Sequence, residues 1–398
     1  SENLKAGIQS RAERLADSIV PFSFLGFGLT LLFTRNITRA VSLLMVDYSC
    51  ALRLSGSIAV MAAQSESAKR GFTVKGSRYF KHMAEADVVV FDKTGTLTQA
   101  SPSVREVTSY NEMPTEKVLR LAACLEEHFP HPVARAVVNE ALKQGLEHRE
   151  RHAEVEYVVA HGIASSINGK RCVIGSEHFV LEDEHVAIPT EELEAIHEKA
   201  AGTSPLFLAV DNTLWGVLYI EDPLKENVAE VVEELRAEGF KRVIMLTGDN
   251  EHTAAAIARQ VGVDSFKAGL LPADKLAVIE ELEARGHTVG MVGDGINDAP
   301  ALARAHVGFA MAGNGTDTAI ETADVALMDD DLRKIPRFIR LSRATFAILV
   351  QNITLALGVK ALFFALTFTG HATMWMAVFA DVGTALLVVA NGLRAMRQ

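Results

Sequence analysis

Two aspartates stand directly after apolar runs, where a side chain is well placed to do chemistry. Asp92 follows the run 88–91, and Asp294 follows the run 288–292 and one glycine. Such runs are typical of buried parallel strands, and ligands bind at the carboxyl ends of these strands. Glycine and hydroxylated residues follow Asp92 in the sequence DKTGTLT, so backbone N–H groups can approach a phosphate closely. We therefore predict that Asp92 is a nucleophile that accepts a phosphoryl group as an aspartyl-phosphate.

The loop after the second run carries the kind of ligands that Mg²⁺ prefers. Its sequence, GDGINDAP, contains two aspartates, one asparagine and two glycines. Mg²⁺ binds through one or two carboxylates together with phosphate and water. We predict Asp294 as a magnesium ligand, together with Asp92 and Thr94. Asp298 and Asn297 are expected to orient the loop and the groups bound to it. A plain surface turn is the alternative, but such a turn rarely needs this many specific residues in a row.

Two further segments are predicted to contact the phosphoryl group. Thr247, Gly248 and Asp249 follow the apolar run 242–246, and their hydroxyl and backbone N–H groups can hold phosphate oxygens at the start of a helix. Simple capping of that helix by Asp249 or Asn250 is the alternative, and both roles can share one geometry. Lys275, near the start of another helix, can place its ammonium group on the phosphoryl group. A lysine in such a position is usually solvated, so this prediction depends on the other segments.

Composition limits the class of protein. The chain has 398 residues, enough for two or three domains. Hydrophobic residues make up 49 % of the chain and the mean hydropathy is +0.17, so some segments are expected to lie in lipid. A net charge of −11 argues against nucleic acid as a partner. Three widely spaced cysteines imply no disulfide framework and fit a reducing compartment.

Alternating strand and helix patterns predict an α/β fold with a parallel sheet. Apolar runs at 87–91, 242–246, 288–292 and 306–310 alternate with helical patterns at 225–238, 252–260, 273–285 and 299–304. Residues 103–220 are patterned differently, with two helices near 114–127 and 131–144 and then short runs such as 155–163, and they are predicted to form an inserted α+β domain. The expected division is a membrane helix pair at 1–66, a phosphorylation domain at 67–102 and 221–335, a nucleotide-binding domain at 103–220, and a second membrane helix pair at 336–398.

Four apolar segments are predicted to span a membrane. They are residues 19–33, 37–63, 345–369 and 372–390. A buried soluble helix is the alternative for 37–63, but the pairing of the segments around short loops favours a membrane bundle. Four spans place both termini and the long middle segment on one side, and the basic residues near both termini indicate the cytoplasm. The cell membrane is the expected location.

The motifs together resemble one protein family. The sequences DKTGTLT, TGDN and GDGINDAP are similar to those of the haloacid-dehalogenase-like phosphorylation domain of P-type ATPases, and the resemblance covers nearly the whole chain. It implies ATP and Mg²⁺ as cofactors. His131-Pro132 resembles the His-Pro element of the heavy-metal (type IB) branch, which implies that His131 and Glu126 contact the adenine end of ATP. A helix-breaking turn is the alternative for His-Pro. Gly162 and Gly175 match glycines of the nucleotide pocket.

The same resemblance implies a transport site in the membrane. Tyr48-Ser49-Cys50 stands where the branch has Cys-Pro-Cys, so only one thiol is present. The segments around Asp381 and residues 391–394 resemble the zinc, cadmium and lead members, which implies Asp381 as a metal ligand and Lys360 as its counter-charge. A structural Lys–Asp pair is the alternative. A site of Cys50, Ser49 and Asp381 is too hard for Cu(I) and suits Zn²⁺, or a neighbour such as Co²⁺ or Mn²⁺.

Part of the family pattern is missing from the sequence. It contains no Thr-Gly-Glu, the loop of the family's actuator domain. We expect the chain to be the C-terminal portion of a pump that needs the actuator portion as a partner, in addition to ATP, the transported ion and lipid. A membrane-anchored haloacid-dehalogenase-like phosphatase is one alternative, although Thr94 stands where such enzymes usually have a second aspartate. A regulatory relative that does not transport is another, because one Cys and the Pro are lost.

Overall fold

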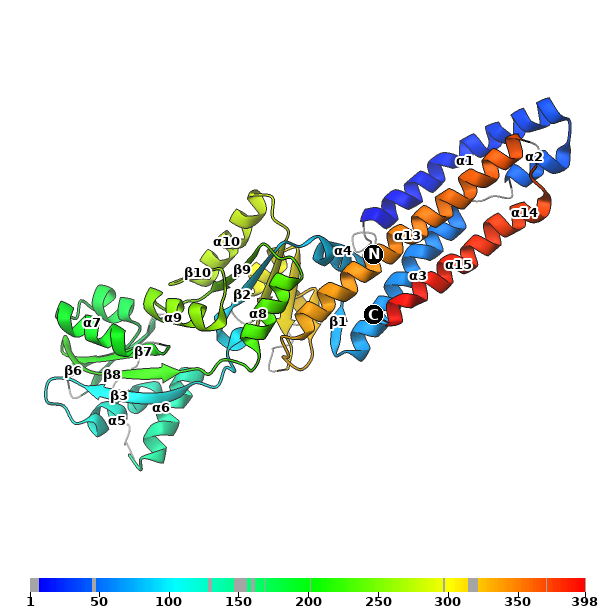
Figure 1. Cartoon of the computed structure of the whole chain (residues 1–398). Coiled ribbons are helices and arrows are strands. Elements are labelled where there is room, and N and C mark those ends of the chain that lie inside the picture. The colour runs from blue at the N-terminus through cyan, green and yellow to red at the C-terminus, as the bar shows by residue number, and fades with distance from the viewer. Residues whose placement is uncertain are drawn as a thin grey trace.

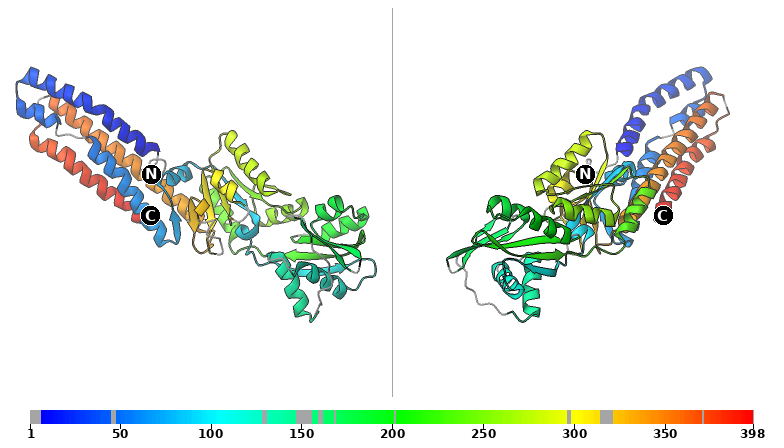
Figure 2. Two further views of the ribbon diagram at one scale, coloured as in Figure 1. Left: turned by 180° about the vertical axis from the view of Figure 1, so that it is seen from behind. Right: turned by 60° about the vertical axis from the view of Figure 1, so that its left-hand side comes forward.

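Three regions follow one another along an elongated molecule (Figures 1 and 2). A six-stranded sheet lies at one end, a seven-stranded sheet lies in the middle, and a bundle of long helices forms the other end. The structure is a computed structural model that describes residues 7–44, 48–127, 131–146, 156–158, 162–167, 169–200, 202–295, 298–313, 321–369 and 371–397. The fold class is α/β, as predicted.

The central sheet has the strand order β1-β13-β12-β11-β2-β9-β10. All neighbouring strands are parallel except β1 and β13. The strands are β1 (Phe72–Val74), β2 (Val88–Asp92), β9 (Arg242–Leu246), β10 (Ser265–Lys267), β11 (Val289–Gly293), β12 (Val307–Met311) and β13 (Val325–Leu327). Its connecting helices are α4 (Ser77–Glu85), α8 (Val228–Ala237), α9 (Glu251–Val261), α10 (Pro272–Ala284) and α11 (Ala299–Arg304).

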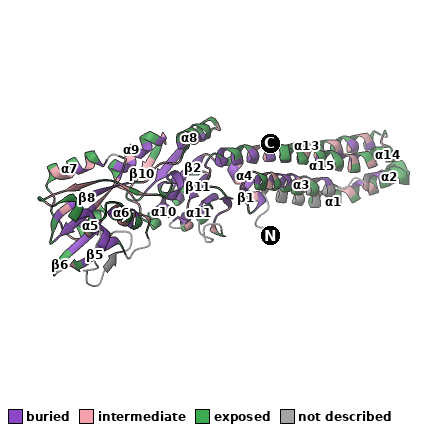
Figure 3. Cartoon of the chain, turned by 90° about the horizontal axis from the view of Figure 1, so that it is seen from below, coloured by how far each residue is buried: buried purple, intermediate pink, exposed green. Residues whose placement is uncertain are grey.

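Burial explains why the central strands read as continuous apolar runs. Every residue of β2, β11 and β12 is buried, because helices cover both faces of the sheet (Figure 3). Alternate residues serve different faces: Val89 and Phe91 pack in one core cluster, and Val88 and Val90 pack in another. The predicted alternation of strands and helices is therefore confirmed.

The second sheet is antiparallel, with the order β3-β8-β7-β6-β5-β4. Its strands are β3 (Ser103–Ser109), β4 (Glu156–Val158), β5 (Gly162–Ile167), β6 (Lys170–Gly175), β7 (Ser204–Val210) and β8 (Thr213–Glu221). Helices α5 (Thr115–Glu126) and α6 (Pro132–Lys143) share a core cluster with one face, and α7 (Thr190–Lys199) packs on the other. The run 155–163, expected as one segment, instead supplies β4 and the start of β5, which pair with each other.

The helical arm contains α1 (Gly7–Thr34), α2 (Ile37–Leu44), α3 (Tyr48–Lys69), α13 (Lys334–Phe368), and a last helical stretch made of α14 (Met374–Val378), η4 (Phe379–Gly383), α15 (Thr384–Gly392) and η5 (Leu393–Arg397). Many large apolar side chains on its surface are exposed, such as Phe33 at 80 % and Trp375 at 85 % (Figure 3). An exposed apolar surface of this kind indicates contact with lipid or protein.

Two of the four predicted spans have the length and apolar character needed to cross a membrane. They are residues 334–367 and 374–397. Within α1, only the shorter stretch 20–34 is strongly apolar. Of the predicted span 37–63, residues 37–44 belong to α2 and residues 48–63 belong to α3, and residues 45–47 lie outside the described residues. The first pair of spans therefore stays a prediction.

Candidate active site

Lys275 joins two carboxylates at the carboxyl edge of the central sheet. Its Nζ lies 2.5 Å from Asp92 Oδ1 and 2.7 Å from Asp298 Oδ1. Asp92 ends β2, Lys275 lies in the first turn of α10, and Asp298 precedes α11. All three side chains are at least nine-tenths buried. The predicted convergence of Asp92 and Lys275 is therefore present in the fold.

The charges in this cluster do not balance. Burial and the neighbouring Asp298 raise the pKa of Asp92 to about 7, although Lys275 acts in the opposite direction. Burial also opposes the charge of Lys275, but Asp92 and Asp298 outweigh it and raise the pKa of the ammonium group above its usual value. A third carboxylate, Asp294, adds to the repulsion on Asp92. Lys275 thus faces two carboxylates, Asp92 and Asp298, and the nearby Asp294 acts on Lys225 as well as on Asp92. A bound cation would add neutralising charge beside these carboxylates.

Asp294 lies against the loop that follows Asp92. Gly95 in this loop has φ +72°, and a Cβ atom on Gly95 would lie 2.9 Å from Asp294 Oδ2. Glycine is therefore required at this position both for its backbone conformation and for the close approach of the carboxylate. Asp92 and Asp294 thus lie at the carboxyl ends of β2 and β11, which pair directly, and Asp294 acts electrostatically on Asp92.

The donor set fits Mg²⁺. Within the described part of the chain, no group of three His, Cys, Asp or Glu side chains is arranged to hold a metal. Mg²⁺ needs only one or two carboxylates, because phosphate and water complete its octahedron. Among the described residues, buried Asp298 Oδ2 has no hydrogen-bond partner, which leaves one oxygen of the cluster for a further interaction. The Thr94 side chain is exposed, and Asn297 lies outside the described residues.

Hydrogen bonds fix the loop after Asp92. The Gly95 N–H donates to Thr98 Oγ1 at 3.0 Å, and the Thr98 N–H donates to the Lys93 carbonyl at 3.1 Å. Lys225 Nζ donates to the Gly95 carbonyl at 3.1 Å. Sequence reasoning missed Lys225, and its place just after the return from the inserted segment was the one signal that could have found it.

The loop 247–250 follows β9 and caps helix α9. The Asn250 side chain accepts the Thr253 N–H at 2.9 Å, so the alternative of simple capping is correct for Asn250. Thr247 Oγ1 is buried and accepts the Asp249 N–H at 3.0 Å. Gly248 is exposed beside it, so its backbone N–H is accessible from solvent.

Asp249 connects the nucleophile loop with the inserted segment. Its Oδ2 lies 2.5 Å from Lys93 Nζ, and its Oδ1 accepts a hydrogen bond from Ser204 Oγ at 2.9 Å. Burial opposes the charge of Asp249, but Lys93 and Ser204 hold its pKa below the usual value. Asp249 is therefore an ionised anchor between the two sheets. Sequence reasoning missed Lys93 and Ser204, and nothing in the pattern around Ser204 could have found it.

The two residues predicted to contact adenine, Glu126 and His131, differ in burial. Glu126 at the end of α5 is buried, and burial raises the pKa of its carboxyl group to about 7. A neutral carboxyl group can both donate and accept hydrogen bonds, as the edge of adenine requires. His131 is exposed and caps α6, with Nδ1 accepting the Val133 N–H at 3.3 Å.

The two glycines of the predicted nucleotide pocket lie opposite each other. Gly162 in β5 pairs with Gly175 in β6. A Cβ atom on Gly162 would overlap the Phe179 ring, so packing alone already requires glycine there. Residues 128–130 and 159–161, which complete this region of the sequence, lie outside the described residues.

We expect Glu126→Gln to remove a pH dependence of stability in the six-stranded sheet. The folded-state pKa of Glu126 is about 7 and the ordinary value is 4.5, so the folded chain binds the proton more tightly. That contribution to stability is complete below pH 4.5 and is lost as pH rises through about 7. The variant should gain roughly 2 kcal/mol relative to the parent at pH 8. Urea unfolding followed by Trp215 fluorescence, with Trp375→Phe as background, measures this; the exposed neighbour Glu127→Gln should show no such gain.

The predicted transport residues are only partly described. Lys360 Nζ lies 3.7 Å from Asp381 Oδ1, with Lys360 buried on α13 and Asp381 on η4. This distance fits both the predicted counter-charge and the structural pair offered as its alternative. Ser49 and Cys50 belong to α3, but their side chains lie outside the described residues.

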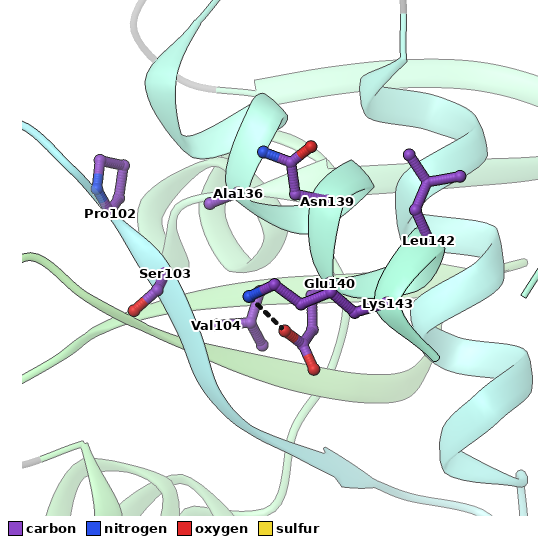
Figure 4. A pocket seen from close by; sticks show the side chains of 8 residues that line it. All are labelled: Pro102, Ser103, Val104, Ala136, Asn139, Glu140, Leu142 and Lys143. Carbon is purple, nitrogen blue, oxygen red and sulfur yellow. Dashed lines mark ion pairs between the residues drawn. The ribbon is translucent and has the colours of Figure 1, made fainter. Parts of the chain in front are cut away.

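A separate pocket lies in the inserted segment (Figure 4). It has a volume of about 470 Å³ between the start of β3 and α6. Lys143 and Glu140 form an ion pair of 3.5 Å in its wall (Figure 4). None of the predicted site residues lines it, so this pocket has no part in the chemistry at Asp92.

Comparison with known proteins identifies the family. A family model for haloacid dehalogenase-like hydrolases matches residues 86–306. This match covers more than half of the chain and includes Asp92, Lys275 and Asp298, so the chain belongs to the haloacid dehalogenase-like hydrolase family.

Beyond the family model, the chain is similar over nearly its whole length to metal-transporting P-type ATPases. It is 39 % identical over 369 residues to a probable cadmium-transporting ATPase of Alkalihalophilus pseudofirmus, covering 91 % of this chain and 50 % of the relative. It is 36 % identical over 395 residues to a manganese-exporting P-type ATPase of Mycobacterium bovis, covering 99 % and 55 %. The crystal structure of a zinc-transporting PIB-type ATPase in an E2.Pi state has a TM-score of 0.69 and 35 % identity, covering 96 % of this chain and 62 % of that one. The chain therefore spans about half the length of the curated relatives it matches.

Proposed function

We propose that this chain is the catalytic and partial membrane portion of a P-type ATPase that uses ATP to move a divalent heavy-metal ion across a membrane. The observation that carries the proposal is the placement of Lys275 between Asp92 and Asp298, next to Asp294. The division into a phosphorylation domain, an inserted nucleotide-binding domain and membrane helices follows the two sheets and the helical arm. The soluble domains would lie in the cytoplasm.

In the proposed reaction, an Asp92 carboxylate oxygen attacks the γ-phosphorus of ATP. A new phosphorus–oxygen bond forms on Asp92, the bond to the β-phosphate oxygen breaks, and ADP leaves. Lys275, Thr247 and the backbone N–H groups near Gly248 stabilise the negative charge on the phosphoryl oxygens. Asp92 and Asp294, with the backbone near Thr94, would hold Mg²⁺, which supplies neutralising charge.

Absence of a second acid favours a phosphoenzyme that persists. Many phosphatases of this family place a carboxyl group two residues after the nucleophile to act as general acid. Thr94 occupies this position, and its side chain cannot provide that proton readily. The phosphoryl group would therefore stay on Asp92 until an actuator portion, expected as a partner of this chain, directs water to it.

The metal is proposed from three side chains. Cys50, Ser49 and Asp381 would provide one sulfur and two oxygen ligands, with Lys360 as counter-charge. Such a set favours Zn²⁺ or a neighbouring divalent ion over Cu⁺. The relatives are described as transporters of cadmium, manganese and zinc, which supports a divalent ion.

Phosphoenzyme formation across a panel of ions tests the proposal. The full-length protein in membranes would be incubated with γ-labelled ATP and Mg²⁺, and with Zn²⁺, Cd²⁺, Co²⁺, Mn²⁺ or Cu⁺. We expect an acid-stable label that requires Mg²⁺ and is stimulated by a divalent ion. Rapid hydrolysis of p-nitrophenyl phosphate without accumulated label would favour the phosphatase. A label that no ion stimulates would favour the regulatory relative.

A further inference from the structure

The carbonyl group of Gly71 is a junction of three elements. It accepts a hydrogen bond from Lys334 Nζ at 3.0 Å and another from the Met328 N–H at 3.0 Å. Gly71 follows the end of α3, Met328 follows β13, and Lys334 begins α13. All views of the chain show the α3–β1 connection beside the start of α13 (Figures 1 and 2). One oxygen atom therefore ties two long helices to the edge of the central sheet.

The Lys334 ammonium group occupies the space that a side chain at position 71 would fill. The Lys334 side chain is only 6 % exposed, and its Nζ also lies 2.6 Å from Asp329 Oδ1. Gly71 has φ +76°, and a Cβ atom there would overlap Lys334 Nζ. The Lys334 side chain is thus held by a carbonyl group and by a carboxylate that is itself 58 % exposed. Displacing the buried ammonium group would separate its charge from both partners.

A pocket is lined by residues that contact this junction and by one that contacts the loop after Asp92. It has a volume of about 460 Å³ and is lined by Lys225, Asp329 and Asp330, among others. Lys225 donates to the Gly95 carbonyl, next to the nucleophile, and Asp330 interacts with Lys225 electrostatically. On the other side of the pocket, Asp329 pairs with Lys334. Lys225 and Lys334 thus interact with two consecutive residues, Asp330 and Asp329.

Both helices that meet at the junction carry residues of the proposed transport site. Ser49 and Cys50 belong to α3, and Lys360 belongs to α13. A packed helix moves as a rigid rod, so a small shift at one end appears at the other end. Helices α3 and α13 also pack directly against each other along the arm. A displacement at Gly71 and Lys334 would therefore change the proposed transport site.

We propose that Lys334, held by Asp329, is a positioning residue that fastens α3 and α13 to the phosphorylation loop, so that phosphorylation of Asp92 is transmitted to both helices through the Gly71 junction. The predicted effect on ion stimulation rests on the proposed function. The coupling itself, between the loop after Asp92 and helices α3 and α13, does not depend on which ion is transported. Coupling of this kind must be measured, because proximity alone does not establish it.

Hydrogen exchange measures the coupling without any transported ion. The full-length protein would be compared with and without Mg²⁺ and beryllium fluoride, a mimic of the phosphoryl group on Asp92. In the parent we expect the amides of the last turn of α3 to change their exchange rate by about fivefold or more. In Lys334→Met that change should vanish. An equal change in Lys334→Met would overturn the proposal.

Arg333→Met is the matched control. Arg333 is the neighbouring residue, loses the same charge, and pairs with Asp331 at 2.9 Å in an exposed ion pair. Its side-chain hydrogen bonds go to Asp331, whereas those of Lys334 go to Gly71 and Asp329, so its response to beryllium fluoride should equal that of the parent. Should Lys334→Met fail to fold, Asp329→Asn replaces it, because this change keeps the shape of the side chain and removes only the charge that fixes Lys334. An unchanged exchange response in Asp329→Asn would then contradict the proposal.

Phosphorylation and ion stimulation provide the second measurement. In Lys334→Met, labelling of Asp92 by ATP should keep the KM of the parent, while stimulation by the transported ion should fall about tenfold or more. A purely structural role would instead lower labelling and stimulation together. If the parent itself shows no ion stimulation, the proposed function fails, and the exchange measurement still decides whether the junction couples the two regions.

Discussion

Asp92→Asn is expected to abolish the acid-stable label from ATP, with a loss of roughly 10³-fold or more. Asn keeps the volume of the side chain, and its carbonyl oxygen can still accept the hydrogen bond that Lys275 donates to Asp92 Oδ1. An amide oxygen is a far poorer nucleophile than a carboxylate, so the chemistry fails while the fold is kept. The label in the parent should also be released by hydroxylamine, which cleaves acyl phosphates and leaves phosphoserine intact.

A second aspartate at the other end of the same strand provides the control. Asp87 precedes β2 and forms ion pairs of 3.0 Å with Lys241 and with His287. Asp87→Asn removes one carboxylate from the same strand but lies at the amino edge of the sheet, away from Lys275. It should label like the parent. If Asp92→Asn labelled as well as Asp87→Asn, another residue would be the phosphoryl acceptor.

The central part of the site could be predicted from sequence because each of its main residues directly follows an apolar run that forms a buried strand. A fully buried strand reads as an apolar run, and its carboxyl end places the next residue at the ligand-binding edge. Asp92, Asp294 and the loop at Thr247 all follow such runs, and helices α8, α9, α10 and α11 fill the intervals between them. The positions of these side chains therefore follow from the order of strands in a parallel sheet.

The remaining features depend on contacts that are distant in sequence. Strands β1, β10 and β13 have three residues each, too few for a periodic pattern to identify them. The ion pair of Lys93 with Asp249 and the hydrogen bond from Ser204 appear only when the two sheets are in place. Local patterns predict elements, whereas their ends and their partners depend on tertiary packing.

Lys275→Met is expected to affect both stability and chemistry, and the two effects can be separated. Removing the ammonium group leaves Asp92 and Asp298 buried and facing each other without their shared cation. Breaking a buried ion pair in this way typically costs about 3–5 kcal/mol of unfolding free energy. Loss of the charge that faces the phosphoryl group should lower the phosphorylation rate by about 10²–10³-fold. Lys267→Met, which removes an exposed ion pair between the end of β10 and Glu281 near the end of α10, should change neither quantity appreciably.

The pH dependence of the Lys275→Met variant distinguishes a lost counter-charge from a general packing defect. In the parent, the folded-state pKa of Asp92 is raised to about 7, so the folded chain holds this proton more tightly than the unfolded chain and stability falls as pH rises toward 7. Without Lys275 the pKa of Asp92 rises further, so the decline should continue above pH 7. Adding Asp298→Asn to the variant removes the carboxylate repulsion and should restore much of the stability, but the phosphorylation rate should stay low because the cation is still missing. Recovery of the rate together with the stability would show that Lys275 supports the fold and takes no part in phosphoryl transfer.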